Sequence, residues 1–135
     1  MADYLQKLPK QHRYVVEVRD KTWLNSEFYS EISLSEEFSS LLRANNAAVA
    51  WVDSPHMPQT LDRTTDFLYI RWEGDRKKVN GTLGKIEADR QADLEVWAQK
   101  IKPYVDRGME IYGYFGKYFS GYPPSDIISL TCFLS

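Results

Sequence analysis

The sequence has few of the residues that build several classes of functional site. It contains a single cysteine, Cys132, so no disulfide can form within the chain. Its two histidines, His12 and His56, lie far apart, and no cluster of cysteine, histidine and carboxylate has the spacing of a metal site. We therefore expect no metal centre, no bound cofactor, and a reducing compartment such as the cytoplasm.

Long apolar runs and charge of one sign are also missing. The longest mostly apolar run, residues 47–52, is far shorter than the ~20 residues of a membrane span. The N-terminus lacks the apolar stretch of a secretory signal. Seventeen basic residues stand against 19 acidic ones, and the basic run at residues 76–78 is typical of a solvated loop. Neither a membrane nor nucleic acid is an expected partner.

What the sequence does have is enough apolar material for a packed core. Hydrophobic residues make up 43% and aromatic residues 14% of 135 residues, which fits one domain over residues 1–135. Short segments rich in β-branched and aromatic residues predict four strands, at residues 14–19, 47–53, 66–72 and 109–115. Their almost continuously apolar interiors are typical of parallel strands.

Helical patterns lie between these strands. Ser33 and Glu36 have the spacing of a capping box at the start of a helix. A second helix is expected from near Glu87, with a kink or an end at Pro103, and a third over residues 125–134. Strands that alternate with helices predict an α/β fold with crossover helices and a parallel sheet, whose site lies at the carboxyl ends of the strands.

Alternation along the strands predicts one apolar face and one face that becomes polar toward the carboxyl ends. Five polar side chains are expected to converge there: Glu17, Arg19, Asp53, Arg71 and Tyr114. One interpretation is an ion-pair network that fixes the strand register. The other is a ligand site in which Arg19 and Arg71 hold an anion while Asp53 or Glu17 moves protons. Glu73, just beyond Arg71, could join either arrangement.

Aromatic residues crowd the last strand and the loop after it: Tyr112, Tyr114, Phe115, Tyr118, Phe119 and Tyr122. Together with Lys117, and with Trp23 from the loop after the first strand, they could form a wall that stacks on a sugar or a base. The alternative is a hydrophobic plug under a loop. The candidate ligand-binding residues are therefore Arg19, Trp23, Arg71, Tyr114, Lys117 and Tyr118.

Two further motifs carry little weight. Residues 81–85 contain two glycines and a lysine but do not follow a strand with phosphate-loop spacing. Asp53, Ser54 and His56 lie close together but lack the Gly-x-Ser-x-Gly elbow of a hydrolase triad.

Several motifs occur in an order that resembles the YecE-like family, also called domain of unknown function 72. They are Glu17-Val18-Arg19 with Thr22-Trp23, then Trp51-Val52-Asp53-Ser54-Pro55, Thr65-Asp66-Phe67-Leu68-Tyr69-Ile70-Arg71, Trp97-Ala98, and Tyr112-Gly113-Tyr114-Phe115 with Gly121 and Pro124. The sequence departs from the family pattern at Gly116-Lys117, where the family commonly has two asparagines, and at Asp20, where a histidine often stands.

The resemblance implies a TIM-type (β/α)8 barrel, which needs ~250 residues. The chain is similar to the C-terminal half of that family, so the resemblance implies four βα units, or a half-barrel. It brings no established reaction. A site for a phosphorylated or carboxylated small molecule is one expected function. The alternative is a non-catalytic interaction protein, a truncated half-barrel whose open edges pair with another copy or with a chain that carries the first four strands.

Overall fold

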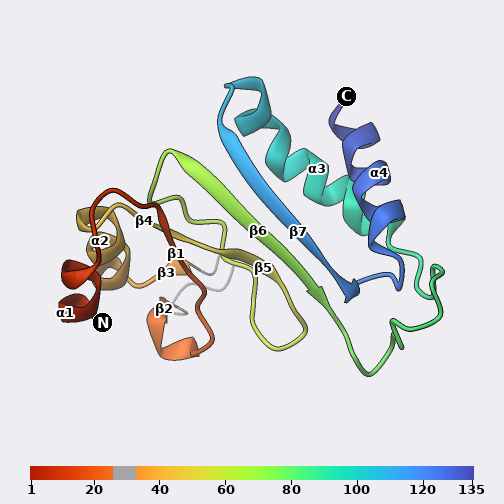
Figure 1. Ribbon diagram of the computed structural model, residues 1–135, viewed down its shortest axis with the longest axis horizontal. Coiled ribbons are helices and arrows are strands. Elements are labelled where there is room, and N and C mark those ends of the chain that lie inside the picture. Colours follow the sequence, from red (N-terminus) through yellow and green to blue (C-terminus); the bar gives the residue numbers. More distant parts are fainter. Residues whose placement is uncertain (26–32) are drawn as a thin grey trace.

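The computed structural model describes residues 1–25 and 33–135, in which parallel strands lie side by side in chain order (Figure 1). Strand β1 (Tyr14–Val16) pairs with β4 (Ala47–Val49). Strand β6 (Phe67–Gly74) lies between β5 (Trp51–Asp53) and β7 (Glu110–Tyr118). Only Ala50 separates β4 from β5, and its N–H donates to the carbonyl of Val16 at 2.9 Å. The predicted α/β fold with parallel strands is confirmed.

The helices differ in detail from the sequence predictions. They are α1 (Ala2–Lys7), α2 (Glu36–Ala44), α3 (Gln91–Asp106) and α4 (Pro123–Leu134), with a 3-10 turn at Lys21–Trp23. None of these described helices is long and apolar enough to cross a membrane. Helix α1 was not predicted. Nor was the antiparallel pair of β2 (Leu24–Asn25) with β3 (Ser33–Leu34).

Three helix boundaries correct the predictions. The predicted capping box is wrong: Ser33 lies in β3, and it is the Ser35 hydroxyl that accepts the Phe38 N–H, at 3.3 Å. Pro103 lies inside α3, because buried residues of α3 on the sheet outweigh the missing backbone hydrogen bond. Helix α4 begins at Pro123, since proline is tolerated in the first turn, where its missing N–H would be unpaired anyway.

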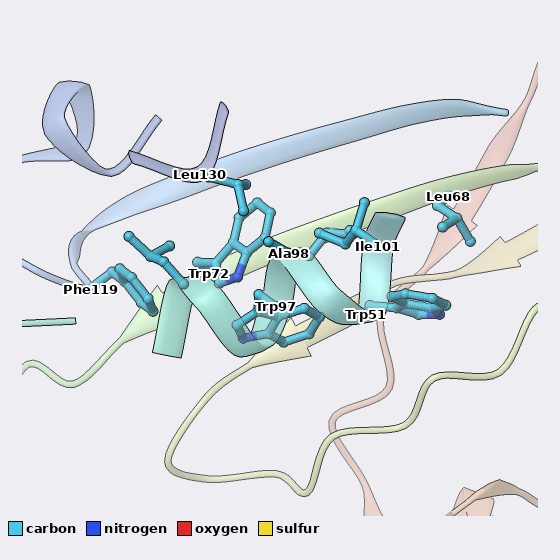
Figure 2. Packing of buried hydrophobic residues seen from close by; sticks show 10 residues of the cluster. Trp51, Leu68, Trp72, Trp97, Ala98, Ile101, Phe119 and Leu130 are labelled. Atoms are coloured by element: carbon cyan, nitrogen blue, oxygen red, sulfur yellow. The ribbon is translucent and has the colours of Figure 1, made fainter. Parts of the chain in front are cut away.

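The larger core lies between the sheet and α3, as Figure 2 shows. Alternate residues of β6, ending at Trp72, point toward Trp97 and its neighbours on α3. The Trp72 ring stacks on Phe115 of β7 at 4.2 Å and meets Trp97 edge-on at 5.6 Å. Trp51 of β5 joins the same core at 1% exposure. These aromatic contacts hold α3 against the face of the sheet formed by β5, β6 and β7.

A smaller core packs α1 and α2 against β1 and β4. It contains Leu5, Phe38, Leu42 and Val49. Val49 and Trp51 are two residues apart on a nearly continuous strand, so both cores lie on the same side of the sheet. The described helices therefore cover one face. We call the opposite side the open face, which carries Phe67, Tyr69, Arg71, Tyr112 and Tyr114.

The connection from β6 to α3 is held by backbone contacts at the carboxyl ends of the strands. The Glu87 carboxylate accepts the N–H groups of Asn80 and Gly81 at 3.0 and 2.8 Å. The N–H groups of Glu87 and Ala88 donate to the Ser120 carbonyl at 2.6 and 3.0 Å. In the glycine-rich stretch at residues 81–85, the first N–H group therefore donates to the Glu87 carboxylate. In a phosphate loop, such N–H groups would bind the phosphate instead.

Candidate functional site

An ion-pair cluster occupies the open face at the carboxyl ends of the strands. Glu17 follows β1 and accepts the Arg71 Nε–H at 2.6 Å on one oxygen. Its other oxygen accepts the Arg19 Nε–H, also at 2.6 Å. Arg71 Nη2 lies 3.5 Å from a carboxylate oxygen of Glu73. The structure therefore brings together Glu17, Arg19 and Arg71 as predicted, and adds Glu73. We call these four residues the Arg71 cluster.

Glu17 is the residue of the Arg71 cluster that pairs with both arginines. Its side chain is 20% exposed, that of Arg71 is 30% exposed, and that of Arg19 is 78% exposed. Burial raises the pKa of Glu17, but hydrogen bonds from Arg71 and Arg19 outweigh it, so this pKa lies below its ordinary value. Glu17 is therefore ionised at neutral pH and acts as the counter-ion of two guanidinium groups. A general acid needs a pKa closer to neutrality.

The Arg71 cluster lines a cavity of about 180 Å³. Residues from the loop after β5 complete its wall: Ser54, His56 and Met57, together with Val52. The sequence-based interpretation did not place these three loop residues at the site. Their position directly after a predicted strand was the available indication, because loops at the carboxyl ends of parallel strands meet at one edge of a sheet.

Asp53 does not join the Arg71 cluster, and the predicted convergence is wrong for this residue. It lies two residues after Trp51 and so shares the helix-covered face. Its carboxylate accepts the Trp97 Nε1–H at 2.7 Å and lies 3.7 Å from Arg90 Nη2. Asp53 thus joins β5 to α3 on the side of the sheet opposite Glu17.

A second cleft, of about 360 Å³, surrounds Arg90 on the helix-covered side. Arg90 Nε donates to Asp93 at 2.6 Å, and Nη1 donates to the Phe119 carbonyl at 3.2 Å. The guanidinium also lies over the Phe119 ring, 3.8 Å from its centroid. Most of its donors therefore serve the fold, tying the start of α3 to the end of β7.

The aromatic residues of β7 and its loop do not form one stacking wall, which was one of the two alternatives; part of them pack in the core, as the other alternative, a hydrophobic plug, expected. Phe115 and Phe119 belong to the core. Tyr114 lies on the open face against Tyr69, with ring centroids 5.2 Å apart. The split follows from strand alternation, which sends successive side chains to opposite faces.

The remaining candidate aromatics are also separate from Tyr114. Tyr118 contacts two cations, with Arg76 at 4.8 Å and Lys117 at 5.2 Å from its ring centroid. It lines the Arg90 cleft and not the cavity of the Arg71 cluster. Trp23 packs on Phe38 of α2, with ring centroids 4.8 Å apart.

A second polar cluster on the open face, at the amino ends of the strands, was not predicted. Arg13, just before β1, contacts Glu110 of β7 at 2.5 Å and lies over the Phe67 ring at 5.0 Å. The Tyr112 hydroxyl donates to the same Glu110 oxygen at 2.9 Å. These contacts link the segment before β1 to the start of β7. These contacts lie at the end of the strands opposite to the one where sites of parallel α/β folds occur, so we expect them to serve stability.

The pH dependence of stability is expected to show the role of Glu17. A carboxylate whose folded-state pKa is lowered stabilises the protein above its unfolded pKa, and this contribution is lost as the pH falls through the folded value. Glu17→Gln should therefore unfold more easily than the wild type at pH 7, by a margin that shrinks as the pH falls through the lowered pKa of Glu17. Urea unfolding at several pH values measures it, with Glu95→Gln on the exposed side of α3 as the control. A margin that does not change with pH would contradict this assignment.

Comparisons with known proteins agree on one family. The family model described as "Protein of unknown function DUF72" matches residues 1–134. A solved DUF72 family protein from Thermotoga maritima is 20% identical, with a TM-score of 0.70, over 98% of this chain and 51% of that one. One from Enterococcus faecalis is 13% identical, with a TM-score of 0.67 and the same coverage. No curated protein matches. The chain spans about half the length of these solved structures, and at such identities the likeness shows the fold alone.

Proposed function

We propose, from the premise that the chain belongs to the DUF72 family of unknown function, that it binds a phosphorylated or carboxylated small molecule on the open face. The observation that carries the proposal is the Arg71 cluster, in which two guanidinium groups border one cavity at the carboxyl ends of parallel strands. Sites in parallel α/β folds lie at that end.

The hydrogen bonds within the Arg71 cluster support anion binding. Glu17 takes only the Nε–H of each arginine, which leaves the terminal nitrogens of Arg19 without a partner among the described residues. The Glu73 contact, at 3.5 Å, is the longest in the cluster, so an incoming anion would replace it at Arg71 Nη2. Planar guanidinium groups bind phosphate and carboxylate through paired N–H donors. Glu17 would hold both arginines in place meanwhile.

The geometry favours a binding role over the acid–base role expected for Glu17 and Asp53. Glu17 is a paired counter-ion, and Asp53 faces α3. Among the candidate ligand-binding residues, Arg19 and Arg71 border the cavity directly. Tyr114 is the open-face neighbour of Arg71 in the sheet register. Trp23, Lys117 and Tyr118 would contact only a ligand large enough to reach beyond the cavity.

A thermal-shift screen with phosphorylated and carboxylated metabolites tests the proposal. At least one such compound, at 100-fold its Kd, should raise the melting temperature of the wild type by roughly 10 °C, since ligand at this excess adds about 2.7 kcal/mol. Arg71→Ala should abolish the shift. Arg107→Ala is the control, because Arg107 is exposed beside Tyr104 on α3, away from the cavity. A screen without any anion-dependent shift, or an unchanged shift in Arg71→Ala, would overturn the proposal.

The architecture of the whole assembly is part of the same proposal. The chain spans about half of the solved structures. By the order of the family motifs that it resembles, its four βα units would be the last four of a TIM-type barrel. A second copy, or a chain that carries four further strands, would complete the barrel. The exposed thiol of Cys132 is compatible with the proposed reducing cytoplasm. If the cavity binds no ligand, an interaction protein built on these open edges is the second candidate.

A further inference from the structure

We propose that the cavity of the Arg71 cluster binds a small zwitterion, an anion that also carries an ammonium group a few bonds away. This inference rests on the proposed function, because the anionic part of the ligand would bind to Arg71 and Arg19. It adds a ligand-binding role for Glu73, which would pair with the cationic part. Phosphorylated amines and amino acids share this chemistry.

The charged groups of the cavity wall alternate in sign. Arg19 contacts Glu17 at 2.6 Å, Glu17 contacts Arg71 at 2.6 Å, and Arg71 lies 3.5 Å from Glu73. All four side chains line the same cavity. Two guanidinium groups and two carboxylates carry no net formal charge. A ligand with only negative charge would therefore complement half of this wall, whereas a zwitterion complements both halves.

The two carboxylates of the cluster differ in how firmly they are held. Each oxygen of Glu17 accepts an Nε–H group at 2.6 Å, one from Arg19 and one from Arg71. Among residues 1–25 and 33–135, the single ion pair of Glu73 is its contact with Arg71 Nη2, and 3.5 Å is beyond the usual range of an N–H···O hydrogen bond. Glu73 is thus the carboxylate that can exchange its partner at little cost.

Anion binding changes the surroundings of Glu73. An anion that takes Arg71 Nη2 leaves the Glu73 carboxylate without its cation and close to the new negative charge. The side chain of Glu73 is only 29% exposed, so water screens this repulsion in part. An ammonium group on the ligand would give Glu73 a new cationic partner in place of Arg71. The exchange would leave each carboxylate of the cluster paired.

The size and the remaining wall of the cavity favour a short ligand. Its volume of about 180 Å³ is smaller than the ~300–1,000 Å³ of pockets that hold drug-sized molecules. Beyond the charged residues, the wall contains the apolar side chains of Val18, Val52 and Met57, together with Ser54 and His56. A short aliphatic linker between the anionic and cationic groups of a ligand would pack against these apolar side chains.

Isothermal titration calorimetry with matched compounds tests the inference. The probes are 2-aminoethyl phosphate, 2-hydroxyethyl phosphate and ethyl phosphate, with β-alanine and propionate as a carboxylate pair. At pH 8 the three phosphates are all dianions, since the second phosphate pKa is about 6. In at least one series, the amine should bind to the wild-type chain about 10-fold more tightly than its analogues, as expected for one charged hydrogen bond at a partly exposed carboxylate. The series that binds identifies the phosphorylated amine or the amino acid as the source.

A variant of Glu73 assigns the preference to this residue. Glu73→Gln keeps the size of the side chain and removes its charge, so the amine and its analogues should bind to it with equal affinity. Glu95→Gln, on the exposed side of α3, is the matched control and should keep the preference of the wild type. Circular dichroism should give the same folded spectrum for all three proteins.

The outcomes separate this inference from the proposed function. Equal wild-type affinities for the amine and its uncharged analogues, lost in Arg71→Ala, would overturn the zwitterion and leave anion binding standing. A preference that persists in Glu73→Gln would also overturn it, as would a hydroxyl compound that binds as tightly as the amine. Binding that is unchanged in Arg71→Ala would overturn both proposals. A wild-type chain that binds none of the five compounds would overturn the zwitterion, and the thermal-shift screen would then decide on anion binding.

Discussion

Replacement of Gly74 by alanine is expected to lower the free energy of unfolding by about 3–5 kcal/mol, combining overpacking with left-handed backbone strain. Gly74 ends β6 with φ of +81°, a conformation that L-residues avoid. An added Cβ would overlap the carbonyl group of Tyr118 and the nitrogen of Phe119. Both are backbone atoms of the neighbouring strand and its loop, so no side-chain rotation relieves the overlap.

A second glycine separates the two causes. Gly84 also has positive φ, +64°, but an added Cβ would meet nothing within 4 Å. Gly84→Ala should therefore cost only about 1 kcal/mol, the backbone contribution. Urea unfolding followed by tryptophan fluorescence measures both variants. Equal losses in the two variants would show that β6 and β7 do not approach each other as described.

Replacement of Trp97 by alanine is expected to cost about 3–5 kcal/mol. Trp97 is 2% exposed, meets Trp72 edge-on and donates its Nε1–H to Asp53. The change opens a cavity in the main core and removes the hydrogen bond to the partly buried Asp53 carboxylate, which keeps only the Arg90 contact at 3.7 Å. Because small domains have only 5–15 kcal/mol of stability, roughly, much of the chain should be unfolded at 37 °C.

A conservative variant divides the effect of Trp97 into packing and hydrogen bonding. Trp97→Phe keeps most of the ring contact and loses the donor to Asp53, which should cost about 1–3 kcal/mol. Val96→Ala, at the neighbouring exposed position, should change stability by less than about 0.5 kcal/mol. Chemical denaturation measures all three variants. A Trp97→Ala variant as stable as Val96→Ala would contradict the assigned core.

The strands and the parallel order could be read from the sequence because they depend on local composition. All four predicted segments contain observed strands, although β1 is shorter than predicted and β7 extends to Tyr118. The helix ends were harder to predict. Ser33 and Ser35 are equally good caps by residue type, and only the pairing of β3 with β2 decides between them. Pro103 lies inside α3 because the helix packs on the sheet. Such tertiary packing cannot be predicted from the residues next to the proline.

The site was predictable in part for a related reason. The alternation of side chains along each strand correctly predicted which residues share a face, so Glu17, Arg19 and Arg71 were placed together. It could not say which face the helices cover, and so Asp53 was assigned to the wrong side. The contact of Arg13 with Glu110 joins residues 97 positions apart, and no local sequence pattern indicates which distant residues the fold brings together. The roles of all these residues in binding remain predictions.

Anion binding at the Arg71 cluster on the open face can be observed in a crystal structure of the chain with the phosphorylated compound that gives the largest thermal shift. We expect the phosphate to lie against the guanidinium groups of Arg71 and Arg19, with Glu73 displaced. A phosphate in the cleft of Arg90 and Lys78, on the helix-covered side, would contradict it.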